Sequence, residues 1–216
     1  MNLNLIKKYV LWIFSILVNA FGNFLLIKGD LGSGPWVAAS IGMSKVFFLQ
    51  IGICTIILNF LVFIPIIFIS KKFEVFKLAG SFFVAYIFGK FLDFFLDIFS
   101  WLHPQHIISR ILFFVIGNLI LSCGISVYLR LNIAMNPFDQ FLKTVNDYLI
   151  PDMKKANYVY LGVPFIIALL FGIYNKSIQG IGIGTLIMLL FNGSFIKLFN
   201  KKVPIPDNIL TPRKYI

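Results

Sequence analysis

The feature that most constrains this chain is a series of long apolar stretches separated by short basic segments. A transmembrane helix needs about 20 mostly apolar residues, because the hydrocarbon core is roughly 30 Å thick and a helix rises about 1.5 Å per residue. The sequence therefore predicts an all-α integral membrane protein with six transmembrane helices. The predicted spans are Val10–Ile27, Ile51–Ser70, Leu78–Ile98, Ile111–Leu129, Tyr158–Tyr174 and Ile178–Lys197.

The composition agrees with a membrane protein and excludes several other classes. Hydrophobic residues make up 59% of the 216 residues and charged residues 12%, about half the charged share of an ordinary soluble domain. These values exclude a disordered chain, a coiled coil and a nucleic-acid-binding module. The two cysteines, Cys54 and Cys123, lie inside apolar stretches, so we expect small core residues rather than a disulfide.

The basic residues predict the orientation. The net charge is +11, but the Lys and Arg residues lie between the spans, where they act as topology signals rather than as a footprint for nucleic acid. With six spans and both termini in the cytoplasm, fourteen of them fall on the inner side and four on the outer side, with Lys90 inside the third span. We expect residues 1–199 to form a single membrane domain. The Pro-containing segment 200–216 is expected to be an extended cytosolic tail.

The two halves of the chain resemble each other. Each half, about 10–98 and about 111–199, holds three spans, and an odd number requires the halves to have opposite orientations in the membrane. Inverted repeats of this kind recur in secondary transporters, where the halves exchange conformations around a central site. The alternative is that duplication only builds a stable bundle. At offsets of 102 and then 104 residues, the matched pairs are Gly22 and Gly124, Lys28 and Arg130, Pro35 and Pro137, Trp36 and Phe138, Gly80 and Gly184, Ser81 and Thr185, Gly89 and Gly193, Phe91 and Phe195, and Phe95 and Phe199.

A short helix that begins with proline is predicted after the first span of each half. Pro35 and Pro137 suit the first helical position, with Gly34 and Asn136 as caps. Asp139 then falls at the third position, where a carboxylate favours the helix dipole. Either these helices re-enter the membrane with their N–H groups facing a central cavity, or they lie at the membrane interface. Asp139 is accordingly either a binding residue or a plain capping residue.

At these motifs the chain resembles the YczE/YyaS/YitT group of bacterial multi-pass membrane proteins, over Asn19–Phe199. In that group the Pro-Trp pair is typically followed by Asp, and a Gly-x-x-x-Asp pattern ends the third span. Gly89–Asp93 matches the second pattern. Val37 replaces the acid of the first pattern, and an acid appears only in the second copy, as Asp139. The resemblance implies a protein of the bacterial inner membrane with a role in transport, and it supplies no substrate.

Charged residues inside the third span form a stripe. Lys90, Asp93 and Asp97 fall with Tyr86 within about 60° of arc on a helix. Lys90 lies past the midplane, so we expect it to face the bundle interior and to pair with Asp93 or with Asp139. Such a pair either binds a substrate ion or is a structural neutralisation. The corresponding stripe in the second half is Leu190, Ser194, Lys197 and Lys201.

Polar residues of the first and fourth spans complete the candidate site. Asn19 and Asn118 each share a helix face with a second polar residue, and they either bond neighbouring helices or line a cavity. His103 and His106 lack a third ligand, so neither a metal nor a cofactor is expected. The candidate substrate-binding residues are Lys90, Asp93, Asp139, Trp36, Asn19 and Asn118. The candidate structural motif residues are Gly34, Pro35, Asn136, Pro137, Gly89 and Gly193.

The leading functional hypothesis is a small secondary transporter, or permease, for a small polar solute, with a central site between the inverted repeats. The alternatives are a substrate-capturing membrane subunit of a multi-component importer and a non-transporting membrane scaffold or regulator. Motifs for an enzyme are missing from the sequence, so no enzymatic activity is expected. The expected partners are the lipid bilayer, a small polar solute, and a second copy or another membrane protein, but no nucleic acid.

Overall fold

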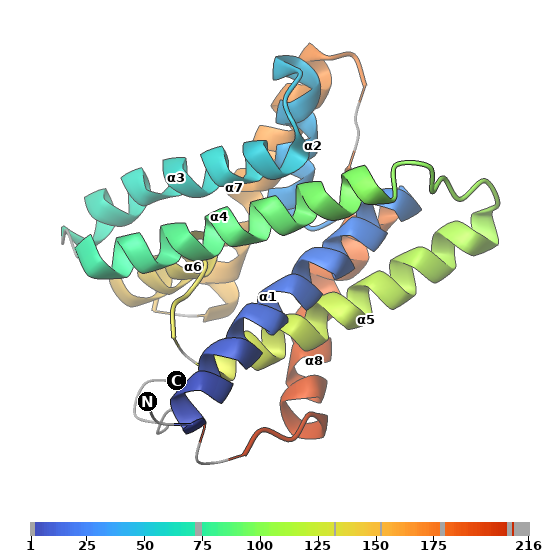
Figure 1. Cartoon of the computed structure of the whole chain (residues 1–216). Coiled ribbons are helices and arrows are strands. Elements are labelled where there is room, and N and C mark those ends of the chain that lie inside the picture. The colour runs from blue at the N-terminus through green and yellow to red at the C-terminus, as the bar shows by residue number, and fades with distance from the viewer. Residues whose placement is uncertain are drawn as a thin grey trace.

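The computed structural model describes residues 3–71, 75–131, 133–151, 153–177, 180–206 and 209, and within these ranges it contains helices and no strand (Figure 1). The predicted all-helical class is confirmed. The eight helices are α1 (Leu3–Gly29), α2 (Pro35–Phe47), α3 (Ile51–Ser70), α4 (Val75–Ile98), α5 (Ile107–Leu131), α6 (Pro137–Tyr148), α7 (Met153–Tyr174) and α8 (Ile183–Lys202).

Five of these helices are long and apolar enough to cross a membrane, namely α1, α3, α4, α5 and α8. Large apolar side chains on their outer surfaces are exposed, as lipid contact requires; Phe68 and Ile108 are examples. These features are those of a multi-pass membrane protein. The remaining predicted span, Tyr158–Tyr174, is a shorter apolar stretch within α7, and its role as a sixth span stays a prediction.

The two predicted Pro-started helices are α2 and α6, each beginning at its proline. The missing N–H of Pro35 or Pro137 costs nothing at the first helical position, where a backbone N–H has no partner within the helix. In α6 the side-chain oxygen of Asn136 also accepts a hydrogen bond from the Phe138 N–H at 3.0 Å. At its other end α2 stops before Phe48, whose φ of 55° is left-handed.

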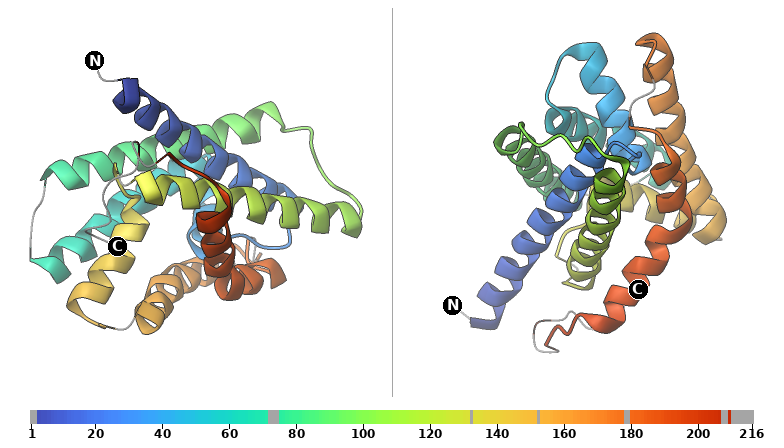
Figure 2. Two further views of the ribbon diagram at one scale, coloured as in Figure 1. Left: turned by 90° about the horizontal axis from the view of Figure 1, so that it is seen from below. Right: turned by 90° about the vertical axis from the view of Figure 1, so that its right-hand side faces the viewer.

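Helices α1 and α5 form the central pair and run side by side in all views (Figures 1 and 2). Glycines on both helices allow this close approach. A Cβ atom added to Gly22 would lie 2.5 Å from the backbone nitrogen of Leu121, and one added to Gly124 would lie 2.8 Å from the backbone nitrogen of Asn19. Small residues at such an interface bring two backbones into direct van der Waals contact.

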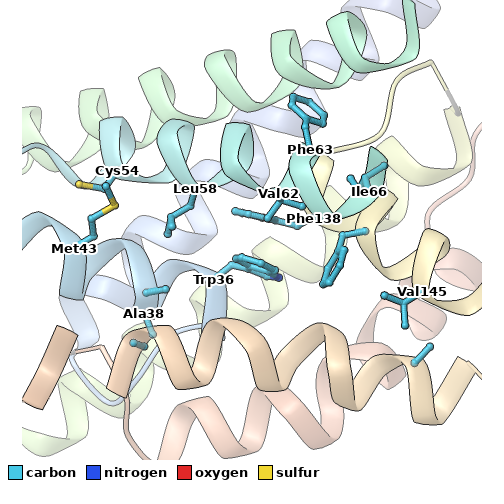
Figure 3. Close-up of a cluster of buried hydrophobic side chains, with 14 residues drawn as sticks. Trp36, Ala38, Met43, Cys54, Leu58, Val62, Phe63, Ile66, Phe138 and Val145 are labelled. Atoms are coloured by element: carbon cyan, nitrogen blue, oxygen red, sulfur yellow. The ribbon is translucent and has the colours of Figure 1, made fainter. Parts of the chain in front are cut away.

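The other helices pack on the central pair directly or form a second group that reaches it through α4. Helix α4 packs on α1 and α3, whereas α8 packs on α5. Both short helices lie against α3 and α7, where they form an apolar core around Trp36, Leu58, Val62 and Phe138 (Figure 3). The beginnings of α2 and α6 therefore meet near the middle of the molecule.

The beginning of the last span differs from the prediction. The apolar pattern places it at Ile178, but α8 begins at Ile183. Gly180 has a left-handed φ of 77°, and its backbone oxygen accepts a hydrogen bond from the Ser33 N–H at 2.8 Å. The glycines here form a loop rather than a helix, because they pack against the segment between α1 and α2.

The segment predicted to be an extended tail, 200–216, begins within a helix. Helix α8 continues to Lys202, so the first residues of 200–216 are helical. The segment 203–206 is not helical, and Pro204 and Pro206 explain why the helix cannot continue. Of the rest, only residue 209 lies within the described residues.

Candidate functional site

A cavity of about 690 Å³ lies between the two halves of the chain. Its wall combines the beginnings of α2 and α6 with faces of α1, α4, α5, α7 and α8. This volume is within the usual range for small-molecule sites, roughly 300–1,000 Å³. The polar side chains on the wall are Asn19, Asn23, Tyr128, Asn136, Asp139, Tyr160, Asn192, Ser194 and Lys197.

The two short helices bring different chemistry to the cavity. Helix α2 has Gly34 at its capping position, so it has no side-chain cap, and its first turn contains no acidic residue. Helix α6 is capped by Asn136 and carries Asp139 in its first turn. Val37 lies on the cavity wall at the position of α2 that corresponds to Asp139 of α6. The wall therefore carries one carboxylate, contributed by the second half.

Among the described residues, the side chain that holds Asp139 is that of Tyr128. The hydroxyl of Tyr128, on α5, donates a hydrogen bond to a carboxylate oxygen of Asp139. The ion pair formed within the described ranges joins Arg110 and Asp30, at the end of α1. No Lys or Arg of the described residues is therefore within ion-pair distance of Asp139.

Aromatic side chains form one side of the cavity. Trp36 stacks on Phe138, with ring centroids 4.0 Å apart and ring planes 10° apart. The ring of Tyr160, from α7, lies 6.1 Å from that of Trp36. Trp36 and Phe138 are both buried, so the chain presents an ordered aromatic wall next to the Asp139 carboxylate.

Amide and hydroxyl groups lie on the side of the cavity formed by α1, α5 and α8. The Asn23 side-chain nitrogen donates to the Asn19 side-chain oxygen at 2.9 Å, so these two residues share one face, as their spacing predicts. Ser122 of α5 donates to the Asn192 side-chain oxygen at 2.8 Å and joins α5 to α8. Lys197, also on α8, is exposed at the cavity wall.

The structure places several of the predicted site residues on this one wall. Of the six predicted substrate-binding residues, Asn19, Trp36 and Asp139 line the cavity. Binding by these residues stays a prediction. The structural motif residues on the wall are Gly34, Pro35, Asn136 and Gly193.

Lys90 and Asp93 lie elsewhere, and the expected interior position of Lys90 is wrong. The Lys90 side chain is exposed, and its ammonium lies 6.0 Å from the centre of the Tyr86 ring. Asp93 is buried and accepts a hydrogen bond from the Gly52 N–H at 2.6 Å, at the beginning of α3. Within the described part of the chain the two side chains form no ion pair, because Asp93 points into the α3–α4 interface while Lys90 points out of it.

The remaining predicted residues are also away from the cavity. Asn118 is buried in α5 but is not on the wall, and its side-chain oxygen has no hydrogen-bond partner within the described ranges. Gly89 packs against α3, where an added Cβ would lie 2.7 Å from the Gly52 backbone oxygen. Pro137, the first residue of α6, is fully buried and does not line the cavity.

Three polar residues of the cavity wall were not singled out from the sequence: Tyr128, Tyr160 and Asn192. The two tyrosines are single aromatic residues in apolar stretches that contain many others, so nothing local distinguishes them. Asn192 precedes the repeat-matched Gly193, and this neighbourhood is the one local signal that could have indicated it.

Comparison with known proteins supports the family resemblance seen in the motifs. Residues 6–201 match the model of a family described as a family of unknown function (DUF6198). The chain is 24% identical over 194 residues to the uncharacterized protein YyaS of Bacillus subtilis (strain 168), covering 89% of this chain and 92% of that protein. The predicted resemblance to a YyaS-containing group is thereby confirmed. No solved structure matches the chain.

Proposed function

The chain belongs to the DUF6198 family, a family of unknown function, and we propose that it is a small secondary transporter for a polar solute. The observation that carries this proposal is the cavity between the two halves, with the beginnings of both Pro-started helices on its wall. Helix beginnings directed at a central site between inverted repeats are a recurring arrangement in transporters. The finer elements of the proposal are two inverted repeats, six spans and alternating access.

The contact between Trp36 and Phe138 supports an inverted repeat. These residues occupy matching positions in the two halves, 102 residues apart. Two residues related by a two-fold axis can touch each other only beside that axis, and these rings stack at 4.0 Å. The axis would then pass next to the cavity, which is where an inverted-repeat transporter places its site.

The α1–α5 interface gives independent support. Gly22 packs on Leu121, and Gly124 packs on Asn19. Adding 102 to the numbers of Gly22 and Asn19 gives Gly124 and Leu121, so each contact is the repeat image of the other. Two halves related by a two-fold axis must form such paired contacts, whereas an arbitrary bundle has no reason to do so.

The helix ends support six spans. Lys28 donates to the Ser100 carbonyl at 3.2 Å, so α1 and α4 end on one side. Arg130 donates to the Val203 carbonyl at 2.8 Å, so α5 and α8 end together. The Ser33–Gly180 contact places the beginning of α8 with the end of α1. If α1 and α5 run in opposite directions across the bilayer, the chain must cross the membrane between α6 and α8, and α7 supplies that crossing.

Differences between the halves support alternating access. Gly89 of α4 packs tightly against α3, but its match in α8, Gly193, has no atom within 4 Å of an added Cβ and lines the cavity. Among the described residues α8 packs on α5 and at most marginally on α7. In the first half, α4 is therefore packed against α3, whereas in the second half α8 stands away from α7 and leaves the cavity open. Exchanging the two arrangements would move the opening of the cavity to the opposite side of the membrane.

Other parts of the proposal follow from the membrane setting. The short helices would re-enter the membrane, because Pro35 and Phe138 at their beginnings are buried in the centre of the bundle rather than exposed at its surface. We further propose a location in the bacterial inner membrane with both termini in the cytoplasm, and no enzymatic activity. The partners would be the bilayer and the transported solute.

A flux measurement tests the proposal. Proteoliposomes and protein-free liposomes are loaded with the same mixture of small amines, amino acids and carboxylic acids, and the solutes that leave are identified by mass spectrometry. We expect at least one class to leave only the proteoliposomes, with a rate that saturates with concentration. Retention of every solute, with and without a proton gradient, would contradict the transporter proposal.

A further inference from the structure

We propose that the central cavity binds a small monovalent organic cation, with the Asp139 carboxylate as its counter-charge. This inference rests on the proposed function, because it assumes that the cavity is the substrate site, and it names the class of substrate. Three observations support it: the missing cation partner of Asp139, the balance of charges on the wall, and the aromatic surface beside the carboxylate.

The first observation is that Asp139 has no positively charged partner within the described part of the chain. Its hydrogen-bond partner is the uncharged Tyr128 hydroxyl, and no Lys or Arg of the described residues lies within ion-pair distance. A half-buried carboxylate in a membrane protein is costly unless it is paired. A cation that enters the cavity would supply that pair, and charge-assisted hydrogen bonds of this kind are about twice as strong as neutral ones.

The second observation is the distribution of charge around the cavity. The charged side chains on its wall are Asp139 and Lys197. Lys197 is exposed and lies near the basic end of α8, which also carries Lys201 and Lys202, so it is placed to reach the polar interface and does not need a ligand to compensate its charge. At the repeat-matched position of Asp139 stands the uncharged Val37. The wall therefore offers a single carboxylate, which matches one positive charge better than two.

The third observation is the surface that adjoins the carboxylate. Trp36, Phe138 and Tyr160 line the cavity, and the first two form one stacked wall. Aromatic faces attract cations and also provide apolar contact area. Trp36 and Phe138 stack face to face and are both buried, so each ring covers one face of the other and the pair contributes mainly apolar contact area. An anion would meet the carboxylate with no positive charge from these rings to compensate it. The combination therefore favours an amine or ammonium group attached to a small apolar body.

Binding of three probes with the same ring and similar length tests the charge preference. The probes are phenethylammonium, the neutral 2-phenylethanol and the anionic 3-phenylpropionate, each titrated into the full-length protein in detergent while thermal unfolding is followed. We expect the cation to raise the unfolding temperature with a saturable dependence, and the other two probes to bind at least about tenfold more weakly. Equal binding of all three probes, or preferential binding of the anion, would overturn the proposal.

Variants of α6 assign the effect to Asp139. Asp139→Asn should weaken phenethylammonium binding at least about tenfold. Asp147→Asn removes a carboxylate that is exposed on the same helix and away from the cavity, and it should change binding by less than about twofold. If Asp139→Asn binds the cation as well as the unchanged protein does, the proposal is wrong. If that variant does not fold, the comparison of the three probes on the unchanged protein still decides.

The binding and flux measurements fail in different ways. Cation binding without flux of any solute would leave the site in place and contradict the transporter proposal. Flux of neutral or anionic solutes that persists in Asp139→Asn would leave the transporter in place and overturn the cation site. Proton-dependent flux that needs Asp139, with no binding of phenethylammonium, would make the carboxylate a proton carrier and would also overturn the substrate class.

Discussion

Three charged residues within or beside the apolar stretches occupy three different environments. Asp139 lies on the cavity wall, Asp93 is buried between α3 and α4, and Lys90 is exposed on the outer surface of α4. A charge in a membrane protein is tolerated where it faces a cavity, forms hydrogen bonds within the protein or reaches the polar interface. The cavity position of Asp139 is compatible with the proposed role in binding. The positions of Asp93 and Lys90 indicate structural roles.

Asp93 acts as the cap of a neighbouring helix, which leads to a prediction. Helix α3 begins after Gln50, whose side chain makes no cap hydrogen bond, and Asp93 accepts the hydrogen bond of the free Gly52 N–H. Asp93→Ala should lower the free energy of unfolding by about 1–2 kcal/mol, because that N–H loses its partner. Asp93→Asn should cost less, because its amide oxygen can still accept. Thermal unfolding in detergent measures both changes.

The matched control is Asp97→Ala, one turn further along α4. Asp97 is exposed, and its hydrogen bond from the Gln50 side chain lies at the surface. This substitution should change stability by no more than about 0.5 kcal/mol. If the Asp93→Ala protein unfolds at the same temperature as the original but transports no solute, the capping role is wrong and Asp93 belongs to the substrate site.

The spacing places Lys90 and Asp93 within about 60° of arc on one helix, because helical spacing is a local property, but the edge of the α3–α4 interface separates them, with Asp93 buried and Lys90 exposed. The sequence does not indicate which helix packs against this part of α4, and the packing partner determines the role of each side chain. The same limit applies to Tyr128, which lies beside Asp139 only because the segment between α5 and α6 turns back on itself. By contrast, Asn19 and Asp139 could be selected from the sequence, because an amide or an acid stands out within or beside an apolar stretch.

At the scale of helices, prediction succeeds where local chemistry determines the boundary. Pro35 and Pro137 mark the beginnings of α2 and α6, and hydropathy indicates the long spans. It fails at α8, because Gly180 and Gly182 are compatible with both a helix and a loop. Their packing against the segment between α1 and α2 selects the loop. Contacts of that kind join residues distant in sequence, so they are absent from any local pattern.

The open position of α8 leads to a prediction about movement. Gly193→Leu should fold normally, because nothing lies within 4 Å of the added Cβ, and the new side chain would enter the cavity. It should nevertheless reduce flux at least about tenfold, because α8 could no longer close onto α7 as α4 closes onto α3. Flux in proteoliposomes and the unfolding temperature are measured together.

Gly162→Leu is the control for this experiment. Gly162 also has no neighbour within 4 Å of an added Cβ, but it lies on α7 and does not line the cavity. Flux and stability should both stay near those of the unchanged protein. If Gly193→Leu transports at the original rate, closure of α8 is not part of the cycle.

At the scale of the whole molecule, the contacts between distant segments are consistent with a single topology in the membrane. The Asp30–Arg110 ion pair, the Lys28–Ser100 bond and the Ser33–Gly180 bond join segments that the count of basic residues places outside. The Arg130–Val203 bond joins segments placed inside. The charge count and the folded contacts are independent observations, and both are compatible with the proposed six crossings, of which the one by α7 rests on a shorter apolar stretch, Tyr158–Tyr174.

Labelling of single cysteines tests this topology and the crossing by α7. In a background with Cys54 and Cys123 replaced by Ala, Lys176→Cys and Lys201→Cys place one thiol at each end of α8, and both positions are exposed. A membrane-impermeant maleimide added to intact spheroplasts should label Lys176→Cys and leave Lys201→Cys unlabelled until the membrane is permeabilised, because Lys201 belongs to the basic inner side. Labelling of Lys201→Cys alone would contradict the proposed topology, because it follows from the reverse orientation and equally from a chain in which α7 does not cross. Protection of both thiols in intact spheroplasts would show that neither α7 nor α8 spans as proposed, since a single crossing by α8 must leave its two ends on opposite sides.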